Sequence, residues 1–143
     1  MRCLCLLLAV LLPAQTAWAL DTQGRLYLFA TCAGRLSALM EHQWLLDGAA
    51  ADQTQAQHAA MLDLLAAILP TDARPRVLHT RIVAKQAQHA LLTRATFNTN
   101  PVDAAWATRQ SARLIAECTG LLPETRQHSE TDDKLHVLGT DWP

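Results

Sequence analysis

The chain has 143 residues, of which 50% are hydrophobic, and its formal net charge at pH 7 is −1. This length suits about one domain, and the hydrophobic content excludes a disordered polar chain. The near-neutral charge argues against a nucleic acid as partner, and an aromatic content of 5% is too low for a platform of stacked bases.

Residues 1–19 have the features of a secretory signal peptide. Arg2 supplies a positive start, an apolar run follows over residues 3–12, and residues 17–19 read Ala-Trp-Ala, a small-x-small cleavage site. The apolar run is too short to span a bilayer. The alternatives are an uncleaved anchor or a buried first helix. We expect cleavage after Ala19 and a periplasmic or secreted protein that is not an integral membrane protein.

The cysteine count agrees with export. Removal of residues 1–19 leaves 124 residues and two of the four cysteines, Cys32 and Cys118. An even number of cysteines in an oxidising compartment favours a disulfide. The alternative is a pair of buried free thiols. We predict a Cys32–Cys118 bond between residues that are 86 positions apart.

Hydrophobic residues at steps of three and four predict four helices. The first is expected from Thr22 to Asp47, before Gly48, and the second from Asp52 to Leu69, before Pro70. The apolar face of the first comprises Leu26, Phe29, Ala33, Leu36, Met40 and Trp44. The apolar stripe of the second comprises Ala59, Met61, Leu62, Leu64, Leu65, Ile68 and Leu69.

The third helix is expected to follow an Asp72 cap, with Pro75 in its first turn, and to end near Phe97. Small residues on its inward face predict close packing against a neighbouring helix. That face is expected to comprise Val77, Ala84, Ala87, Leu91 and Ala95.

The fourth helix has the clearest start in the sequence. Asn100 is a good N-cap, Pro101 suits the first helical position, and Asp103 adds negative charge in the first turn. Gly120 is expected to end the helix in a left-handed conformation. Trp106 in this helix and Trp44 in the first are both expected in the core, whereas exposed tryptophans would be hot spots of an interface.

Short connections predict that consecutive helices are antiparallel neighbours. We therefore expect an all-α fold over residues 20–122, a disulfide-stapled antiparallel up-down-up-down four-helix bundle. Cys32 in the first half of the first helix and Cys118 in the last turn of the fourth would then share one end. Residues 123–143 form a polar C-terminal tail that we expect to be disordered, the alternative being that it docks on the bundle.

The sequence lacks the motifs of several common kinds of catalytic and cofactor site. It contains no Glu-x-x-His, His-Glu-x-x-His, Cys-x-x-Cys-His or G-x-S-x-G motif, and no Gly-rich phosphate loop. We therefore expect no cofactor, no metal and a role other than catalysis. Two metal alternatives stay open: histidines that converge from different helices, and a weak site in the tail. The tail residues concerned are His128, Glu130, Asp132, Asp133 and His136.

One row of basic residues stands out on the third helix. Arg81, Lys85 and His89 are four apart, and like charges at that spacing are unfavourable by a few tenths of a kcal/mol. An acidic protein partner would offset the repulsion. The alternatives are an ordinary solvated face and cover by acids of the chain itself. Those acids are Asp63, Glu130, Asp132 and Asp133.

These features predict a small exported helical protein that acts by binding. We expect a non-catalytic protein-binding module, such as an inhibitor, an immunity-type protein, an adaptor or a chaperone. The alternative is a small-molecule or metal carrier that uses the bundle interior and has histidines or methionines meeting across helices. An enzyme with a dispersed site is a third reading without positive support.

Overall fold

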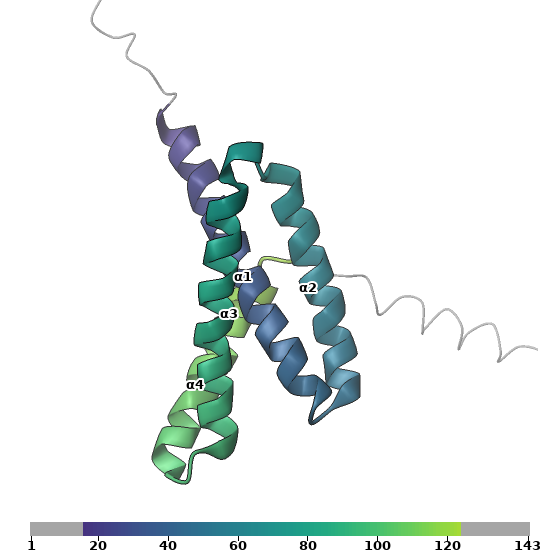
Figure 1. Ribbon diagram of the computed structural model, residues 1–143, viewed down its shortest axis with the longest axis vertical. Helices are drawn as coiled ribbons and strands as arrows, with labels where there is room; N and C mark the ends of the chain where they lie inside the picture. Colours follow the sequence, from purple (N-terminus) through teal and green to yellow (C-terminus); the bar gives the residue numbers. More distant parts are fainter. Residues whose placement is uncertain (1–15, 124–143) are drawn as a thin grey trace, which may run out of the picture.

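The computed structural model describes the backbone of residues 16–123 and the side chains of residues 22–123. Most of the predicted signal segment and the tail from residue 124 lie outside these described residues. Over the described part, the chain forms four α-helices and one short 3-10 turn, with no strand (Figure 1). The all-α fold class is therefore confirmed.

Each predicted helix is present, with its ends moved by a few residues. The elements are α1 (Thr16–Trp44), α2 (Gly48–Ile68), the 3-10 turn η1 (Thr71–Ala73), α3 (Arg74–Phe97) and α4 (Pro101–Thr119). The backbone of α1 is already helical at the position predicted for signal cleavage. The connections are short, and the chain turns back at each of them (Figure 1).

Of the two predicted ends of α4, the N-cap is confirmed and the left-handed C-terminal glycine is wrong. The Asn100 side chain accepts hydrogen bonds from the backbone N–H groups of Val102 at 2.9 Å and Asp103 at 3.4 Å, as predicted for the N-cap of α4. The predicted left-handed Gly120 is wrong, because its φ is −65°. The chain continues there in a right-handed turn, in which the N–H of Leu121 donates to the carbonyl of Cys118 at 3.2 Å.

The starts of α2 and α3 correct the sequence prediction. Asp47, expected inside the first helix, instead caps α2 and accepts from the N–H of Ala50 at 3.1 Å. Asp72 lies in η1 and does not cap α3, whose N-cap is Ala73 without a side-chain hydrogen bond. The carboxylate of Asp72 lies 3.9 Å from Arg76 instead. Pro75 occupies the first turn of α3, as expected.

The centre of the fold is α1, which packs against each of the other three helices, while α3 also packs against α4. In the described residues, α2 packs mainly on α1 and has little contact with α3. A closed bundle would instead bring every pair of consecutive helices together. The closed up-down-up-down arrangement therefore stays a prediction.

The core forms two hydrophobic clusters along α1. The first comprises Leu26, Ala30, Leu65, Ala73 and Val77. The second comprises Cys32, Ala33, Leu36, Met61 and Cys118. α2 contributes Leu65 to the first cluster and Met61 to the second, so adjacent turns of α2 pack against both parts of the core on α1.

The predicted disulfide is present between α1 and α4. Cys32 and Cys118 are bonded, their Cα atoms lie 5.3 Å apart, and both residues are fully buried. The bond lies in the second core cluster and covalently links the first helix of the chain to the last.

Gly34 marks a close approach of α1 and α3. A Cβ atom placed there would overlap the backbone carbonyl oxygen of Arg81 and lie 3.0 Å from the backbone nitrogen of Lys85. It would also lie 3.1 Å from the Cβ atom of Ala84. The predicted tight packing of the third helix on a neighbour therefore occurs at Ala84, with a glycine as its counterpart.

Both tryptophan predictions are wrong. Trp44 is 54% exposed and Trp106 is 47% exposed. Trp44 is the last residue of α1, where the neighbouring helices no longer cover it, and the Trp106 ring packs against the guanidinium of Arg94 at 5.8 Å. The inward face of α3 also differs, since Gln88 and Leu92 are buried whereas Ala87 is exposed. This shift follows from α3 packing against α1 and α4 together.

Candidate functional site

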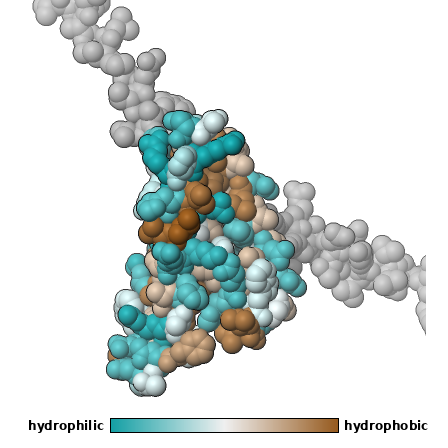
Figure 2. Space-filling model, viewed as in Figure 1, coloured by the Kyte–Doolittle hydropathy of each residue, from teal (hydrophilic) through white to brown (hydrophobic). Residues whose placement is uncertain are grey.

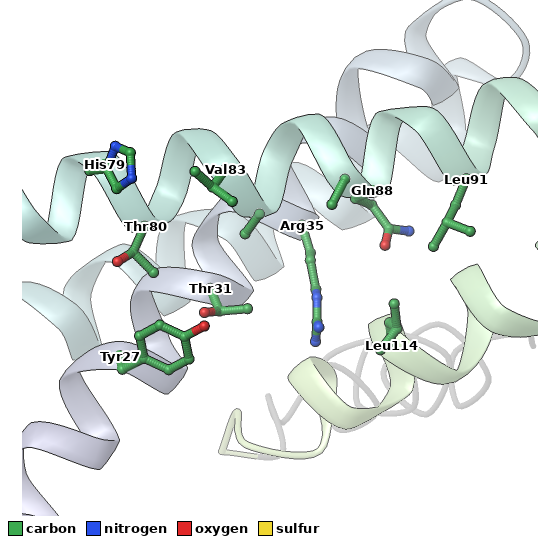
Figure 3. Close-up of a pocket in the computed structure, with 11 residues that line it drawn as sticks. Tyr27, Thr31, Arg35, His79, Thr80, Val83, Gln88, Leu91 and Leu114 are labelled. Atoms are coloured by element: carbon green, nitrogen blue, oxygen red, sulfur yellow. The ribbon is translucent and has the colours of Figure 1, made fainter.

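A cavity of about 410 Å³ lies where α1, α3 and α4 meet (Figure 3). Volumes of 300–1,000 Å³ are typical of small-molecule sites. Three lining residues come from α1 and one from α4, while α3 supplies the rest. They are Tyr27, Thr31, Arg35, His79, Thr80, Val83, Ala84, Ala87, Gln88, Leu91 and Leu114. We refer to this cavity as the α1–α3–α4 cleft.

The α1 wall of the cleft is a polar row. Tyr27, Thr31 and Arg35 are four residues apart, which places their side chains above one another on one side of the helix. The row borders the buried positions Ala30 and Gly34, so its side chains stand at the edge of the α1–α3 contact. Figure 3 shows the Arg35 side chain extending through the middle of the cleft toward α4.

Two buried polar atoms without a partner lie at this cleft. Gln88 is 1% exposed, and its Nε2 donates to the Ser111 hydroxyl at 2.7 Å, but its Oε1 has no hydrogen-bond partner. The Thr31 hydroxyl oxygen is likewise buried without a partner. Each such group costs about 1–3 kcal/mol of desolvation. Native structures keep few of them, so each calls for a physical explanation, such as a bound water or ion.

Arg35 places a positive charge in the cleft. Its side chain is 22% exposed, and its Nη1 lies 3.9 Å from a Glu117 carboxylate oxygen and 4.0 Å from the Cys118 sulfur. Both distances are too long for strong hydrogen bonds. A guanidinium has five N–H donors in a planar fork, so most of them are left for another acceptor.

Apolar side chains form the opposite wall. Val83, Ala87 and Leu91 of α3 and Leu114 of α4 line the cleft. Figure 3 shows Leu91 and Leu114 extending toward each other from the two helices. The cleft therefore combines a guanidinium and several other polar groups with an apolar surface. This combination can bind and orient a small amphipathic molecule.

The predicted basic row of Arg81, Lys85 and His89 is partly neutralised by an acid of the chain itself. The Lys85 ammonium forms an ion pair with Glu41 of α1 at 2.6 Å. Arg81 and Lys85 are half-buried at a smaller cavity of about 190 Å³, and His89 is exposed. Of the acids expected to compensate this row, Asp63 makes no ion pair in the part of the chain described, and those of the tail lie outside it. The compensating acid is Glu41, which the sequence analysis did not name.

His58 on α2 has the one resolved pKa shift among residues 22–123. Its pKa lies below the ordinary 6.5, first because burial disfavours the charged ring and then because Arg81 and Lys85 repel a proton, while Glu41 opposes the shift. Its Nε2 is also a buried atom without a hydrogen-bond partner. Protonation of His58 is therefore less favourable in the folded protein than in the unfolded chain.

This shift predicts a pH-dependent stability. As the pH falls below about 6.5, the unfolded chain takes up a proton at His58 that the folded chain resists, so the free energy of unfolding should decrease. We expect this decrease between about pH 7.5 and about pH 5.5 to be smaller in His58→Gln, measured by urea unfolding. Exposed His89 provides the control His89→Gln, which should keep the wild-type decrease. An equal decrease in His58→Gln and wild type would contradict the assignment.

Sequence reasoning did not single out Tyr27, Thr31, Arg35 or Gln88. A signal existed for Gln88, because it falls four residues after Ala84 on the inward face of α3, where a polar residue interrupts the apolar stripe. The polar row on α1 has steps of four, which are visible in the sequence. No periodicity, however, shows that this row meets α3 and α4.

No group of three or more histidine, cysteine, aspartate or glutamate side chains that could hold a metal ion occurs within residues 22–123. The metal-site residues suggested in the tail lie outside the described part. None of the helices described is both long and apolar enough to cross a membrane. Comparison with known proteins found no matching family model, no matching curated protein and no matching solved structure.

Proposed function

We propose that this chain is an exported, non-catalytic binding protein that holds a small amphipathic molecule in the α1–α3–α4 cleft. The single observation that carries this proposal is the cavity of about 410 Å³, whose lining combines the Arg35 guanidinium with apolar side chains of α3 and α4. Its lining also includes Gln88, which is 1% exposed and whose Oε1 is buried without a partner, at a cost of about 1–3 kcal/mol. The proposal develops the small-molecule alternative of the sequence analysis, with a lateral cleft in place of a bundle interior.

The proposal includes the processing and topology expected from the sequence. Residues 1–19 are removed as a signal peptide, and the remaining chain acts in a periplasm or outside the cell as an antiparallel up-down-up-down bundle. The buried Cys32–Cys118 bond supports export, because stable disulfides are typical of oxidising compartments. The tail beyond residue 123 is a separate polar segment in this proposal.

A matched pair of substitutions tests whether the cleft binds. Ala87 and Ala90 are both exposed on α3, but only Ala87 lines the cleft. Tryptophan at position 87 would fill the apolar wall, whereas tryptophan at position 90 would not. We expect Ala87→Trp to bind N-phenyl-1-naphthylamine, a neutral probe that fluoresces in apolar sites, at least about tenfold more weakly than wild type. Fluorescence titration measures this affinity.

The Ala90→Trp variant is expected to bind the probe like wild type. Equal affinity in all three proteins would place the probe elsewhere and contradict the cleft as the binding site. Circular dichroism of both variants verifies that each remains helical. Absence of binding to the wild-type protein would reject the proposed function.

A second candidate function is protein binding at one end of the molecule. The His42 ring nitrogen lies 3.0 Å from the Thr96 hydroxyl, which joins the last turns of α1 and α3. Large exposed hydrophobic residues surround this junction, and Figure 2 shows hydrophobic surface at the corresponding lower end. They are Trp44 at 54% exposure, Leu45 at 81%, Leu46 at 63% and Phe97 at 70%.

This surface favours the protein-binding module expected from the sequence, such as an inhibitor, an immunity-type protein, an adaptor or a chaperone. It supports an apolar partner surface better than the acidic partner expected for Arg81, Lys85 and His89, because Glu41 already neutralises Lys85. A native mass spectrum of the protein from its exported fraction separates the two candidates. Retained mass of small-molecule size favours the cleft, and retained mass of protein size favours the exposed end.

A further inference from the structure

We infer that the ligand of the α1–α3–α4 cleft is an amphipathic organic carboxylate, whose carboxylate binds Arg35 and whose apolar body lies against α3 and α4. This inference rests on the proposed function, because it names the chemical class that the same cleft would select. The observations that carry it are the position of the Arg35 guanidinium, the absence of acids from the described lining and the apolar opposite wall.

Most N–H donors of the Arg35 guanidinium form no short hydrogen bond within the described residues. Its contact with Glu117 is 3.9 Å long, and its contact with the Cys118 sulfur is 4.0 Å long. A carboxylate matches the planar fork of a guanidinium and forms two parallel hydrogen bonds with it. A ligand carboxylate would therefore make a stronger interaction than Arg35 makes within the described chain.

If a ligand displaced Glu117 from Arg35, the Glu117 carboxylate would still have a cationic partner. Its carboxylate also lies 3.6 Å from Arg113 Nε on the same helix, and its side chain is 54% exposed. Displacement by a ligand would leave Glu117 in contact with Arg113 and with water. The existing Arg35–Glu117 contact is thus a weak competitor for a carboxylate ligand.

The rest of the α1 wall suits an anion as well. Thr31 lies one turn before Arg35 and has a buried hydroxyl without a partner, and Tyr27 lies one turn before Thr31. In Figure 3 the Tyr27 hydroxyl points along the cleft toward Thr31 and Arg35. Hydroxyl groups can donate to a carboxylate. An ammonium ligand would instead meet the Arg35 charge in a cleft whose described lining contains no aspartate or glutamate.

The α3 wall selects the remainder of the ligand. Val83, Ala87 and Leu91 present apolar surface, and burial of that surface by an apolar ligand favours binding. The Gln88 amide is held by the 2.7 Å bond to Ser111, and its Oε1 is buried without a partner. The expected ligand therefore has a carboxylate at one end and an apolar body with few polar groups.

Three probes of eight carbons each test the charge preference. Octanoate, octan-1-ol and octylammonium are each used to displace N-phenyl-1-naphthylamine from the protein that comprises residues 20–143. We expect octanoate to displace the probe at about tenfold lower concentration than octan-1-ol, since its carboxylate forms a charge-assisted hydrogen-bonded pair with Arg35 that an alcohol cannot form. Octylammonium should be the weakest of the three.

Substitutions then assign the preference to one residue. Arg35→Gln should abolish the preference for octanoate over octan-1-ol, measured as the ratio of the two displacement concentrations within the same protein. Arg35→Lys keeps the positive charge, so it should retain part of the preference for octanoate. The rest should be lost, because lysine lacks the planar fork of a guanidinium. Arg109 is exposed on α4 and does not line the cleft, so Arg109→Gln is the matched control and should behave like wild type.

The outcomes separate this inference from the proposed function. If the wild-type protein does not bind the neutral probe, the proposed function fails. If it binds the probe in the cleft but octan-1-ol competes as well as octanoate, the carboxylate inference is overturned and the function stands. Persistence of the octanoate preference in folded Arg35→Gln would also overturn the inference, because another residue would then bind the octanoate carboxylate.

Discussion

Reduction of the Cys32–Cys118 disulfide is expected to lower the free energy of unfolding by about 4–5 kcal/mol. The bond joins residues 86 positions apart, and the loop entropy removed from the unfolded chain grows with the logarithm of loop length. Domains of this size have total stabilities of about 5–15 kcal/mol. Loss of the bond would therefore remove a large fraction of the stability.

Urea unfolding with and without reductant measures this effect. The predicted mature chain contains only these two cysteines, so reductant acts on a single bond. Cys32→Ala with Cys118→Ala is a second route to the same state, and the two routes should agree within the cost of the small cavities that alanine leaves. The helical signal should remain before the unfolding transition. A change below about 1 kcal/mol would show that the unfolded chain is already compact around these residues.

Gly34→Ala is expected to destabilise the protein by about 2–3 kcal/mol, although alanine is the better helix former. The new Cβ atom would overlap the backbone oxygen of Arg81, which belongs to a helix and cannot rotate away as a side chain can. It would also crowd Ala84 at 3.1 Å. Relief requires α1 and α3 to separate, and that separation would weaken the packing on both sides of the contact.

Gly24 in the same helix is the matched control. A Cβ atom at Gly24 meets nothing within 4 Å, and the residue is exposed. Gly24→Ala should therefore stabilise the helix by up to about 1 kcal/mol, because alanine loses less backbone entropy on folding. The two substitutions should shift the urea midpoint in opposite directions. A shift of the same sign in both would contradict the close approach of α1 and α3 at Gly34.

The fold could be predicted from the sequence where local interactions decide it. Asn100 caps α4 because its side chain reaches N–H groups two and three residues ahead, and this geometry needs nothing from the rest of the chain. Gly120 shows the limit of the same reasoning. A glycine after a helix permits a left-handed residue, but the right-handed turn toward Leu121 and Leu122, which pack against the second core cluster, prevailed.

The candidate site could be predicted only in fragments. The steps of four between Tyr27, Thr31 and Arg35 are present in the sequence, but their place in a cleft depends on where α3 and α4 cross α1. Gln88 reads as a surface residue by type, yet it is buried through its bond to Ser111, 23 residues away. The basic residue Lys85 reads as part of a partner surface, yet its partner is Glu41, 44 residues away.

The sequence by itself determined the four helices and the pairing of Cys32 with Cys118. Helix formation depends on hydrogen bonds and side-chain periodicity within about one turn, and the two cysteines that the predicted signal cleavage would leave allow one pairing. The tertiary structure alone decided the exposure of Trp44, the contact at Gly34 and the α1–α3–α4 cleft. These depend on how helices cross, and the crossing is set by the sum of many small packing contacts between residues distant in the chain.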